Sequence, residues 1–421
     1  MTGTSDLLAV YGGTPVVSAP QPHFPWPLID ERTHAAVARQ LDESVSLYNR
    51  SGVIARVEDR LRAAVGVKHA LLTNSGTSAL HSMYVACGLG PGDEVICPAY
   101  TFFATATPLF FTGAVPVPVD CGDDGNMDAA AVEAAITPRT KAIVVTHMWG
   151  LPCDMDRLLE VAERHGLMLL EDTSHAYGAT YKAMPVGSFG HAAAQSLQGQ
   201  KPLTGGEGGV LLTNHDDVHY GGVAVGHYNV RCKQEIPAHH PLAEFAVTGM
   251  GLKFRIHPLA AAIVEQQMDE YEDVLAGRTR IAAVMAERLG ALRGVTPLLP
   301  SEGSTSSWYA LILRLDAAVP GNAGPEEIQK ALEAEGAVEV DRPGSTRPIP
   351  QLPLFQRPGD VFPSYRGVRM PEASCFPQAN AFHSSILKLP VWHRAADEKI
   401  VDEYLTAFEK VWAHLERHGS I

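Results

Sequence analysis

The sequence predicts an α/β protein built around a large, mostly parallel, seven-stranded sheet. Three observations support this. Short apolar segments alternate with longer amphipathic ones from about residue 66 onward. Several of the apolar segments end in polar, glycine-containing clusters. No internal repeat or low-complexity tract interrupts the alternation. Strands that alternate with helices pair in parallel, and ligands bind outside the carboxyl ends of such strands.

We expect three regions along the 421 residues. Residues 1–30 are rich in proline and glycine and predict an extended N-terminal arm. Residues 31–274 carry the alternating pattern and predict the large domain. Residues 275–421 predict a smaller α+β domain at the C-terminus, a division that is reasonable for a chain of this length.

The elements of the large domain follow from apolar periodicity. Helical spacing covers Ile29–Val65 and breaks near Ser51 and Gly52. Seven strands are expected, over His69–Thr73, Glu94–Cys97, Val115–Val119, Ala142–Thr146, Leu167–Leu170, Ala192–Leu197 and Gly209–Thr213. Helices are expected between them, over Ser78–Cys87, Phe102–Phe111, Asp128–Ala135 and Asp154–His165.

The rest of the chain predicts fewer strands. Apolar residues recur at helical spacing throughout His257–Leu289, which predicts a single long helix. A strand over Trp308–Leu315 and helices over Pro325–Glu335 and Lys399–Arg417 follow. The intervening residues 339–385 contain many proline, serine and aromatic residues and predict a long, functional loop.

Composition excludes several classes of protein. The chain has 33 Lys and Arg against 47 Asp and Glu, a net charge of −14, which argues against nucleic-acid binding. No stretch of eighteen apolar residues predicts a membrane span, and no signal peptide is indicated, so we expect a cytoplasmic protein. The six cysteines show no CxxC spacing and the histidines no HExxH pattern, so we expect reduced thiols and no metal site.

The segment Asn74-Ser-Gly-Thr-Ser-Ala-Leu80 lies between a predicted strand and a predicted helix. Gly76 permits a tight turn, and the hydroxyls of Thr77 and Ser78 lie beside the first N–H groups of the helix. Such a helix N-terminus can bind a phosphate. The alternative is an ordinary helix cap without a ligand.

Two acids, Glu171 and Asp172, follow a hydrophobic strand, and His175 comes three residues later. A carboxylate at the carboxyl end of a strand is well placed to hold a protonated ring nitrogen. The alternative is that Asp172 only caps a helix.

A single lysine, Lys201, follows the strand that ends near Ser196 and precedes a loop with four glycines. No acid lies near it in sequence before Glu207. A partly enclosed lysine can lose its proton and form a Schiff base. The alternative is a solvated surface lysine.

These three clusters together fit one cofactor. Pyridoxal 5'-phosphate needs a phosphate site, a carboxylate for its pyridine nitrogen, a wall for its ring and a lysine for its aldehyde. Tyr100 and Phe102, near another strand end, are the candidates for the wall.

At these residues the chain resembles the sugar aminotransferase (DegT/StrS-like) group of the fold-type-I pyridoxal-phosphate enzymes. The resemblance extends from Leu8-Ala-Val-Tyr-Gly-Gly-Thr-Pro to Leu389-Pro-Val-Trp-His. Its landmarks are Asn74-Ser-Gly-Thr-Ser-Ala-Leu, Gly92-Asp-Glu-Val-Ile-Cys-Pro, Glu171-Asp172 and Lys201-x-Leu-Thr-x-Gly-Glu-Gly-Gly. The combination of these motifs is far more specific than any one of them.

The resemblance implies a role for each matching residue. Lys201 would bond to the cofactor's aldehyde and move the proton, and Asp172 would keep the pyridine nitrogen protonated. Phe102 would stack on the ring, and His175 would lie near the ring oxygen. The phosphate would be bound by Thr77, Ser78 and Ser196, with the backbone of Gly76–Ser78.

The family also has a Gly-x-Asn-x-Arg segment that reaches the phosphate of the neighbouring subunit. Here the segment is Gly251-Leu-Lys-Phe-Arg255, with Lys253 in place of asparagine. A lysine could serve the phosphate as a point charge. The resemblance therefore implies a homodimer with shared active sites.

The implied activity is transfer of an amino group from glutamate or glutamine to a ketone of a sugar, nucleotide sugar or cyclitol. Lys201 favours this reaction, because related sugar dehydratases carry histidine at that position. Two alternatives stay open: cyclisation and dehydration, as in 3-amino-5-hydroxybenzoate synthase, and a cofactor-bound sensor without turnover. A nicotinamide dehydrogenase is disfavoured because no GxGxxG follows the first strand of the alternating series.

The acceptor is harder to predict. The opening segment, which ends in Phe24-Pro-Trp-Pro27, resembles that of cyclitol-specific members in antibiotic pathways and favours a cyclitol or sugar-like ketone. The candidates for the substrate pocket are Trp149, His227, Tyr228 and residues 339–385, although residues of this kind are more often ordinary packing or loop.

Overall fold

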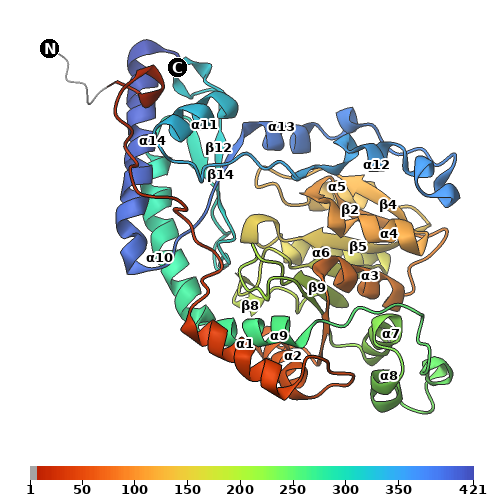
Figure 1. Ribbon diagram of the computed structural model, residues 1–421. Coiled ribbons are helices and arrows are strands. Elements are labelled where there is room, and N and C mark those ends of the chain that lie inside the picture. The colour runs from red at the N-terminus through yellow and green to blue at the C-terminus, as the bar shows by residue number, and fades with distance from the viewer. Residues whose placement is uncertain (1–6) are drawn as a thin grey trace.

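A seven-stranded sheet forms the centre of the protein, as the computed structural model of residues 7–421 shows (Figure 1). Its spatial order is β1-β10-β9-β6-β5-β2-β4. Only β10 runs antiparallel to its two neighbours, so the predicted mostly parallel sheet is confirmed. In chain order the strands are β1 (His69–Thr73), β2 (Glu94–Pro98), β4 (Val115–Val119), β5 (Thr140–Thr146), β6 (Met168–Asp172), β9 (Ala192–Ser196) and β10 (Gly209–Thr213).

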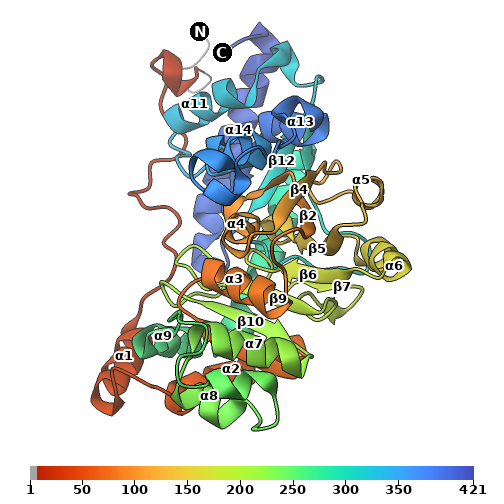
Figure 2. The same cartoon turned by 90° about the vertical axis from the view of Figure 1, so that its right-hand side faces the viewer.

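Helices cover both faces of this sheet. Successive strand residues point to opposite faces, so Leu71 packs in the core on one side and Leu72 in the core on the other. One face carries α3 (Gly76–Ala86), α4 (Thr107–Thr112) and α7 (Asp216–Gly226); α3 and α7 lie side by side in Figure 2. The other face carries α2 (Gly52–Val65), α5 (Ala129–Ala134), α6 (Met155–His165) and α9 (Pro258–Met268). Two further helices, α1 (Glu31–Glu43) and α8 (Val230–Glu235), pack on α9 and α7.

A second, three-stranded antiparallel sheet lies towards the C-terminus. It packs with its helices around a separate core that includes Trp392, Phe408 and Trp412. The elements are β11 (Val295–Pro297), β12 (Leu311–Leu315), β14 (Ile386–Leu389), α10 (Tyr271–Gly290), α11 (Pro325–Ala334) and α14 (Glu398–His418). The predicted division between residues 274 and 275 falls inside α10 and stays a prediction.

The chain from residue 7 to residue 30 crosses the molecule as an irregular segment beside α10 and α14 before it enters α1 (Figure 1). Residues 1–6 of the predicted arm lie outside the described residues. Hydrogen bonds hold the segment in place: Trp392 Nε1 donates to the His23 carbonyl at 2.7 Å. Further along, Trp26 Nε1 donates to the Lys201 carbonyl at 3.0 Å. The arm therefore ends against the loop that carries the predicted catalytic lysine.

Three local predictions are wrong. The helix predicted over His257–Leu289 is two helices, because the chain turns at Asp269 and Glu270 between α9 and α10. The helix predicted over Phe102–Phe111 begins only at Thr107; a short strand and a 3-10 turn precede it. The strand predicted from Trp308 begins at Leu311.

The predicted loop 339–385 contains several short elements: β13 (Thr346–Pro348), α12 (Pro353–Gln356), α13 (Pro377–Ser385) and 3-10 turns. β13 pairs with β3 (Tyr100–Phe102), and a small hairpin is formed by β7 (Thr180–Tyr181) and β8 (Met184–Pro185). Within residues 7–421, no helix has the length and apolar character needed to cross a bilayer.

Candidate active site

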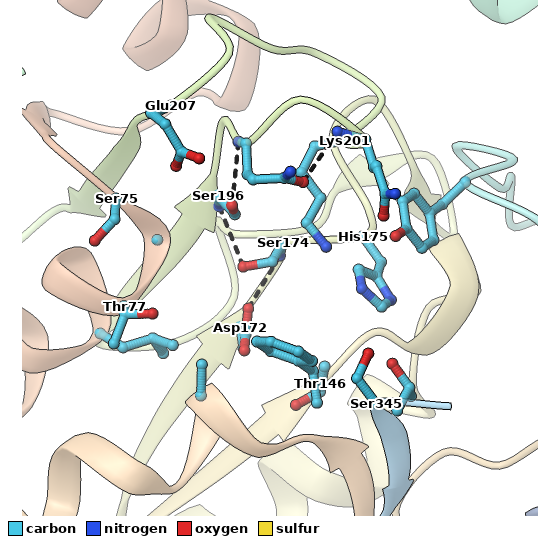
Figure 3. A pocket seen from close by; sticks show the side chains of 18 residues that line it. Ser75, Thr77, Thr146, Asp172, Ser174, His175, Ser196, Lys201, Glu207 and Ser345 are labelled. Atoms are coloured by element: carbon cyan, nitrogen blue, oxygen red, sulfur yellow. Dashed lines mark hydrogen bonds between the residues drawn. The ribbon is translucent and has the colours of Figure 1, made fainter. Parts of the chain in front are cut away.

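A cavity of about 400 Å³ lies at the carboxyl ends of β5, β6 and β9 (Figure 3). This is where a parallel sheet is expected to bind its ligand. Each of these three strands ends in a polar residue that lines the cavity: Thr146, Asp172 and Ser196. The lining also includes Ser75, Gly76, Thr77, Phe102, Ser174, His175, Gln198, Gln200, Lys201, Glu207, Tyr309, Ser345 and Thr346.

The N-terminus of α3 forms one side of the cavity. Ser75 caps the helix: its hydroxyl accepts a hydrogen bond from the Ser78 amide at 3.1 Å. A Cβ on Gly76 would lie 2.6 Å from the Cβ of Ser196, so only glycine lets the helix approach β9 this closely. The first amides of a helix have no partner within it and favour an anion. The hydroxyls of Thr77 and Ser196 lie nearby. We call this part of the cavity, formed by Gly76, Thr77 and Ser196, the anion corner; it fits a phosphate group.

The two consecutive acids on β6 have different surroundings because neighbouring strand residues face opposite sides. Glu171 is fully buried away from the cavity; it accepts hydrogen bonds from the amides of Gly187, Phe189 and Gly190 at 2.7–2.9 Å. Asp172 lines the cavity and is 4% exposed. Glu171 is therefore a structural acid, and Asp172 alone can contact a ligand.

One hydroxyl group and one backbone amide hold the Asp172 carboxylate in place. Thr105 donates to Oδ2 at 2.7 Å, and the Ser174 amide donates to Oδ1 at 3.0 Å. Thr105 is in turn within hydrogen-bond distance of Thr101 and Thr146, which form a small buried network. Sequence reasoning missed this support because it placed residues 102–111 in a helix. The threonine-rich run beside Phe102 was the available signal.

Lys201 extends into the cavity from the loop after β9 (Figure 3). Burial of its ammonium group lowers its pKa to about 8; the Asp172 carboxylate opposes this shift and the Lys388 ammonium adds to it. The Nζ atom lies 4.7 Å from the centre of the Tyr309 ring. An amine of this pKa is partly neutral near pH 7.5 and can act as a nucleophile or a base.

His175 stacks on Tyr309, with ring centres 4.1 Å apart, and Trp149 lies 5.5 Å away on a tilted plane. Burial, with smaller contributions from the charges of Lys201 and Lys388, holds the pKa of His175 well below its usual range. The Trp149 amide donates to its Nδ1 at 3.4 Å, which leaves Nε2 as the protonated nitrogen. His175 is thus a neutral hydrogen-bond donor beside the lysine. Tyr309 was missed in the sequence because it belongs to no motif.

The structure brings most of the predicted site residues together. Gly76, Thr77, Phe102, Asp172, His175, Ser196 and Lys201 all line one cavity. Ser345 and Thr346 show that the predicted functional loop also reaches it.

Other candidates lie outside the lining. Ser78 is behind Ser75, Tyr100 is fully buried against Phe382, and Lys253 is exposed on the surface. Trp149 is not among the lining residues; its ring contacts those of His175 and Tyr309, which line the cavity. The suggested substrate-pocket residues His227 and Tyr228 are also not among the lining residues, and His227 is buried.

Comparison with known proteins decides the family. A profile of the DegT/DnrJ/EryC1/StrS aminotransferase family matches residues 27–405. The chain belongs to this family. The aminotransferase activity expected from the motifs is therefore confirmed.

Two relatives of this aminotransferase indicate its subgroup. GDP-perosamine synthase from Caulobacter vibrioides is 35% identical over 82% of this chain and 86% of its own. L-glutamine:2-deoxy-scyllo-inosose aminotransferase from Micromonospora echinospora is 32% identical over 98% of this chain and 100% of its own. The relatives are thus sugar and cyclitol aminotransferases.

A putative sugar aminotransferase from Streptococcus pneumoniae, solved in its PLP form, superimposes with a TM-score of 0.77. It is 25% identical, and the match covers 92% of this chain and 99% of the other. Pyridoxal 5'-phosphate, the cofactor predicted from the sequence, is confirmed at the level of the family. The residues also fit it: the aminotransferase has an anion corner at Gly76, an aromatic wall at Phe102, a fixed carboxylate at Asp172 and a buried amine at Lys201.

Proposed function

We propose that the protein transfers the amino group of glutamine or glutamate to a ketone on a sugar or cyclitol. The observation that carries this proposal is that Lys201, Asp172 and the anion corner at Gly76 line one cavity. The names of two relatives support this donor and these acceptors: one is an L-glutamine:2-deoxy-scyllo-inosose aminotransferase and the other a GDP-perosamine synthase.

Pyridoxal phosphate, when bound, supplies an aldehyde that bonds to amines and a ring that stabilises negative charge. The chain's own residues position and protonate the reacting groups. Thr77, Ser196 and the first amides of α3 would bind the phosphate. Phe102 would pack against the ring, and Asp172 would accept a hydrogen bond from the ring nitrogen and keep it protonated.

Lys201 moves the proton. Its Nζ atom has a pKa of about 8, so it can accept a proton from a substrate carbon and return it without a large energetic cost near neutral pH. Asp172 is held by Thr105 and the Ser174 amide, so its carboxylate needs no rearrangement when the ring arrives. His175, neutral and protonated at Nε2, would be available to donate to the cofactor's ring oxygen.

Two variants test the assignment. Lys201→Ala is expected to lose both the absorbance band of the lysine-bound cofactor and turnover. Asp172→Asn is expected to keep most cofactor affinity but to lower turnover by at least about a hundredfold, because the ring nitrogen then loses its anionic partner. Lys330→Ala, on the exposed face of α11, is the control. Retained turnover in Lys201→Ala would exclude this lysine as the catalytic amine.

Mixing the cofactor-loaded protein with glutamine or with glutamate tests the donor. We expect one of them to remove the absorbance band of the lysine-bound cofactor in a single turnover, and a ketone acceptor to restore it. A band that neither amino acid changes would favour a sensor without turnover.

We also propose a homodimer in which Lys253 faces the cofactor phosphate of the second subunit. Large apolar side chains are exposed on the segments near Lys253, which is unusual for a surface that faces only water. They are Tyr48, Phe245, Val247, Met250 and Leu252, with 38–61% of their area exposed. Sedimentation of the wild-type protein would test the dimer. A Lys253→Ala variant that stays dimeric and binds the cofactor as tightly as wild type would exclude this role for Lys253.

The biological context is proposed from the same relatives: synthesis of an aminated sugar or cyclitol in antibiotic or other secondary metabolism. The predicted cytoplasmic location remains a prediction.

A further inference from the structure

A second chamber of about 410 Å³ adjoins the candidate active site. Gln200 and Tyr309 line both spaces, so these two side chains form the boundary between them. The chamber lies between the N-terminal arm, the strand β14 and the segment before β13. Its remaining lining residues are Phe24, Trp26, Ala310, Gln329, Val338, Glu339, Val340, Asp341, Lys388 and Pro390.

Three charged side chains line this chamber. Lys388 Nζ lies 2.8 Å from Asp341 Oδ2, so the only cation of the lining is already paired with an acid. Glu339 adds a second carboxylate, whose Oε1 accepts hydrogen bonds from the backbone amides of His23 and Phe24. The formal charge of the lining is therefore −1. It offers no free cation to a phosphate or a carboxylate.

Several polar atoms of the chamber have no protein partner among residues 7–421. They are Asp341 Oδ1, Glu339 Oε2, Gln329 Oε1 and the side-chain amide of Gln200. These atoms provide acceptors from different segments of the chain and, at Gln200, two N–H donors. The apolar part of the lining consists of the rings of Phe24 and Trp26 with Val338, Val340 and Pro390. Clustered acceptors beside aromatic rings suit a small ring that carries many hydroxyl groups.

The chamber is close enough to take part in the reaction. Lys388, on its wall, contributes to lowering the pKa values of both Lys201 and His175. Trp26, also on its wall, donates a hydrogen bond to the Lys201 carbonyl. A molecule with its carbonyl carbon at Lys201 could therefore place its remaining hydroxyl groups beyond Tyr309.

We infer that this chamber binds the hydroxyl groups of the amino acceptor, and that the acceptor is an uncharged polyhydroxylated ring rather than a nucleotide-linked sugar. The inference rests on the proposed function and narrows its substrate class. Hydroxyl groups can donate to the free carboxylate oxygens of Asp341 and Glu339 and accept from Gln200. A nucleotide diphosphate here would bring two phosphate anions towards a lining that is already negative and would leave them unpaired.

Binding of an unreactive polyol tests this inference without turnover. The probe is myo-inositol, titrated calorimetrically into the cofactor-loaded protein, and uridine diphosphate is the anionic comparison. Asp341→Asn removes one charged acceptor and is expected to weaken myo-inositol binding by at least about tenfold. Gln329→Leu removes a neutral acceptor and is expected to weaken it about threefold to tenfold. Asp273→Asn, an exposed acid on α10 outside the chamber, is the control and is expected to bind as wild type.

The outcomes separate this inference from the proposed function. Weaker myo-inositol binding in both chamber variants, with uridine diphosphate failing to compete, supports the chamber as the hydroxyl subsite. No myo-inositol binding to wild type, unchanged affinity in both variants, or displacement by uridine diphosphate would overturn it. The proposed function is tested independently by the first half-reaction with glutamine or glutamate, which needs no acceptor and is expected to survive in both variants.

Discussion

The buried amine of Lys201 makes a prediction about stability as well as catalysis. Burial lowers its pKa from 10.5 to about 8, so the folded protein holds this proton less tightly than the unfolded chain does. Below pH 8 the ammonium group must still be buried, which costs free energy. We therefore expect Lys201→Met, which removes the charge but keeps a long side chain, to stabilise the protein free of cofactor while abolishing its activity.

The size of the stability gain follows from the pKa values of Lys201 in the folded protein and in the unfolded chain. A difference of about 2.5 pKa units corresponds to about 3 kcal/mol at pH 7. As the pH rises from about 8 to 10.5, the folded protein loses the proton first and the cost disappears. At pH 10 only about 1 kcal/mol should remain. The gain from Lys201→Met is therefore expected to fall by about 2 kcal/mol between pH 7 and pH 10, whatever the methionine adds through packing.

The assay is urea unfolding of the cofactor-free wild type and variant at several pH values, followed by circular dichroism. Lys330→Met, in which an exposed lysine is replaced, is the control and should show no pH-dependent gain. A Lys201→Met variant that is no more stable than wild type at pH 7, or whose gain is the same at pH 7 and pH 10, would refute the reasoning.

Three further substitutions test other parts of the site. Gly76→Ala places a Cβ 2.6 Å from the Cβ of Ser196 and is expected to raise the Kd for pyridoxal phosphate at least about tenfold, measured by fluorescence titration. Thr105→Val removes the hydroxyl that donates to Asp172 and is expected to lower kcat about tenfold with little change in cofactor affinity. Glu171→Gln weakens the contacts to three backbone amides and is expected to lower the free energy of unfolding by about 3 kcal/mol, measured in urea.

Each of these variants has a matched control. Gly90→Ala adds a Cβ whose nearest neighbour is 3.9 Å away and should leave cofactor binding unchanged. Thr112→Val, in α4 away from the cavity, is the control for Thr105→Val and should keep the wild-type kcat. Glu160→Gln removes an exposed acid; it is the control for Glu171→Gln and should keep the wild-type free energy of unfolding. Cofactor affinity equal to wild type in Gly76→Ala would contradict the close packing of α3 on β9. Full kcat in Thr105→Val, or full stability in Glu171→Gln, would contradict the roles assigned to those hydrogen bonds.

The sequence predicted the central sheet well because its strands are buried on both faces. A strand such as Gly209–Thr213 is a short, mostly apolar run between a glycine-rich segment and Asn214, and the observed boundaries agree with the predicted ones. The break between α9 and α10 could not be predicted in this way. Met268 and Tyr271 both face inwards at helical spacing, so the apolar pattern continues across the turn. A tertiary contact that the sequence does not reveal, the hydrogen bond from Tyr271 to the Tyr177 carbonyl, holds the first residue of α10.

The residues of the candidate site also fall into those that the sequence could predict and those that it could not. Lys201, Asp172 and Gly76 could be predicted because each lies in a local motif at the end of a strand. Tyr309 could not, because it reaches the cavity only through long-range packing from the C-terminal part of the chain. For residues 339–385 the sequence predicted a functional loop, but the pairing of Thr346 with Phe102 that brings this residue to the cavity could not be predicted. Between Glu171 and Asp172, strand alternation alone could not show which carboxylate faced the cavity, since both faces of the sheet are buried.

The most direct test of the account is to locate the covalent bond. The protein is loaded with pyridoxal phosphate, reduced with borohydride, digested, and analysed by peptide mass spectrometry. We predict a single modified peptide, with the reduced cofactor on Lys201. Modification at another lysine, or none under conditions where the protein is active, would contradict the central claim that Lys201 is the catalytic amine.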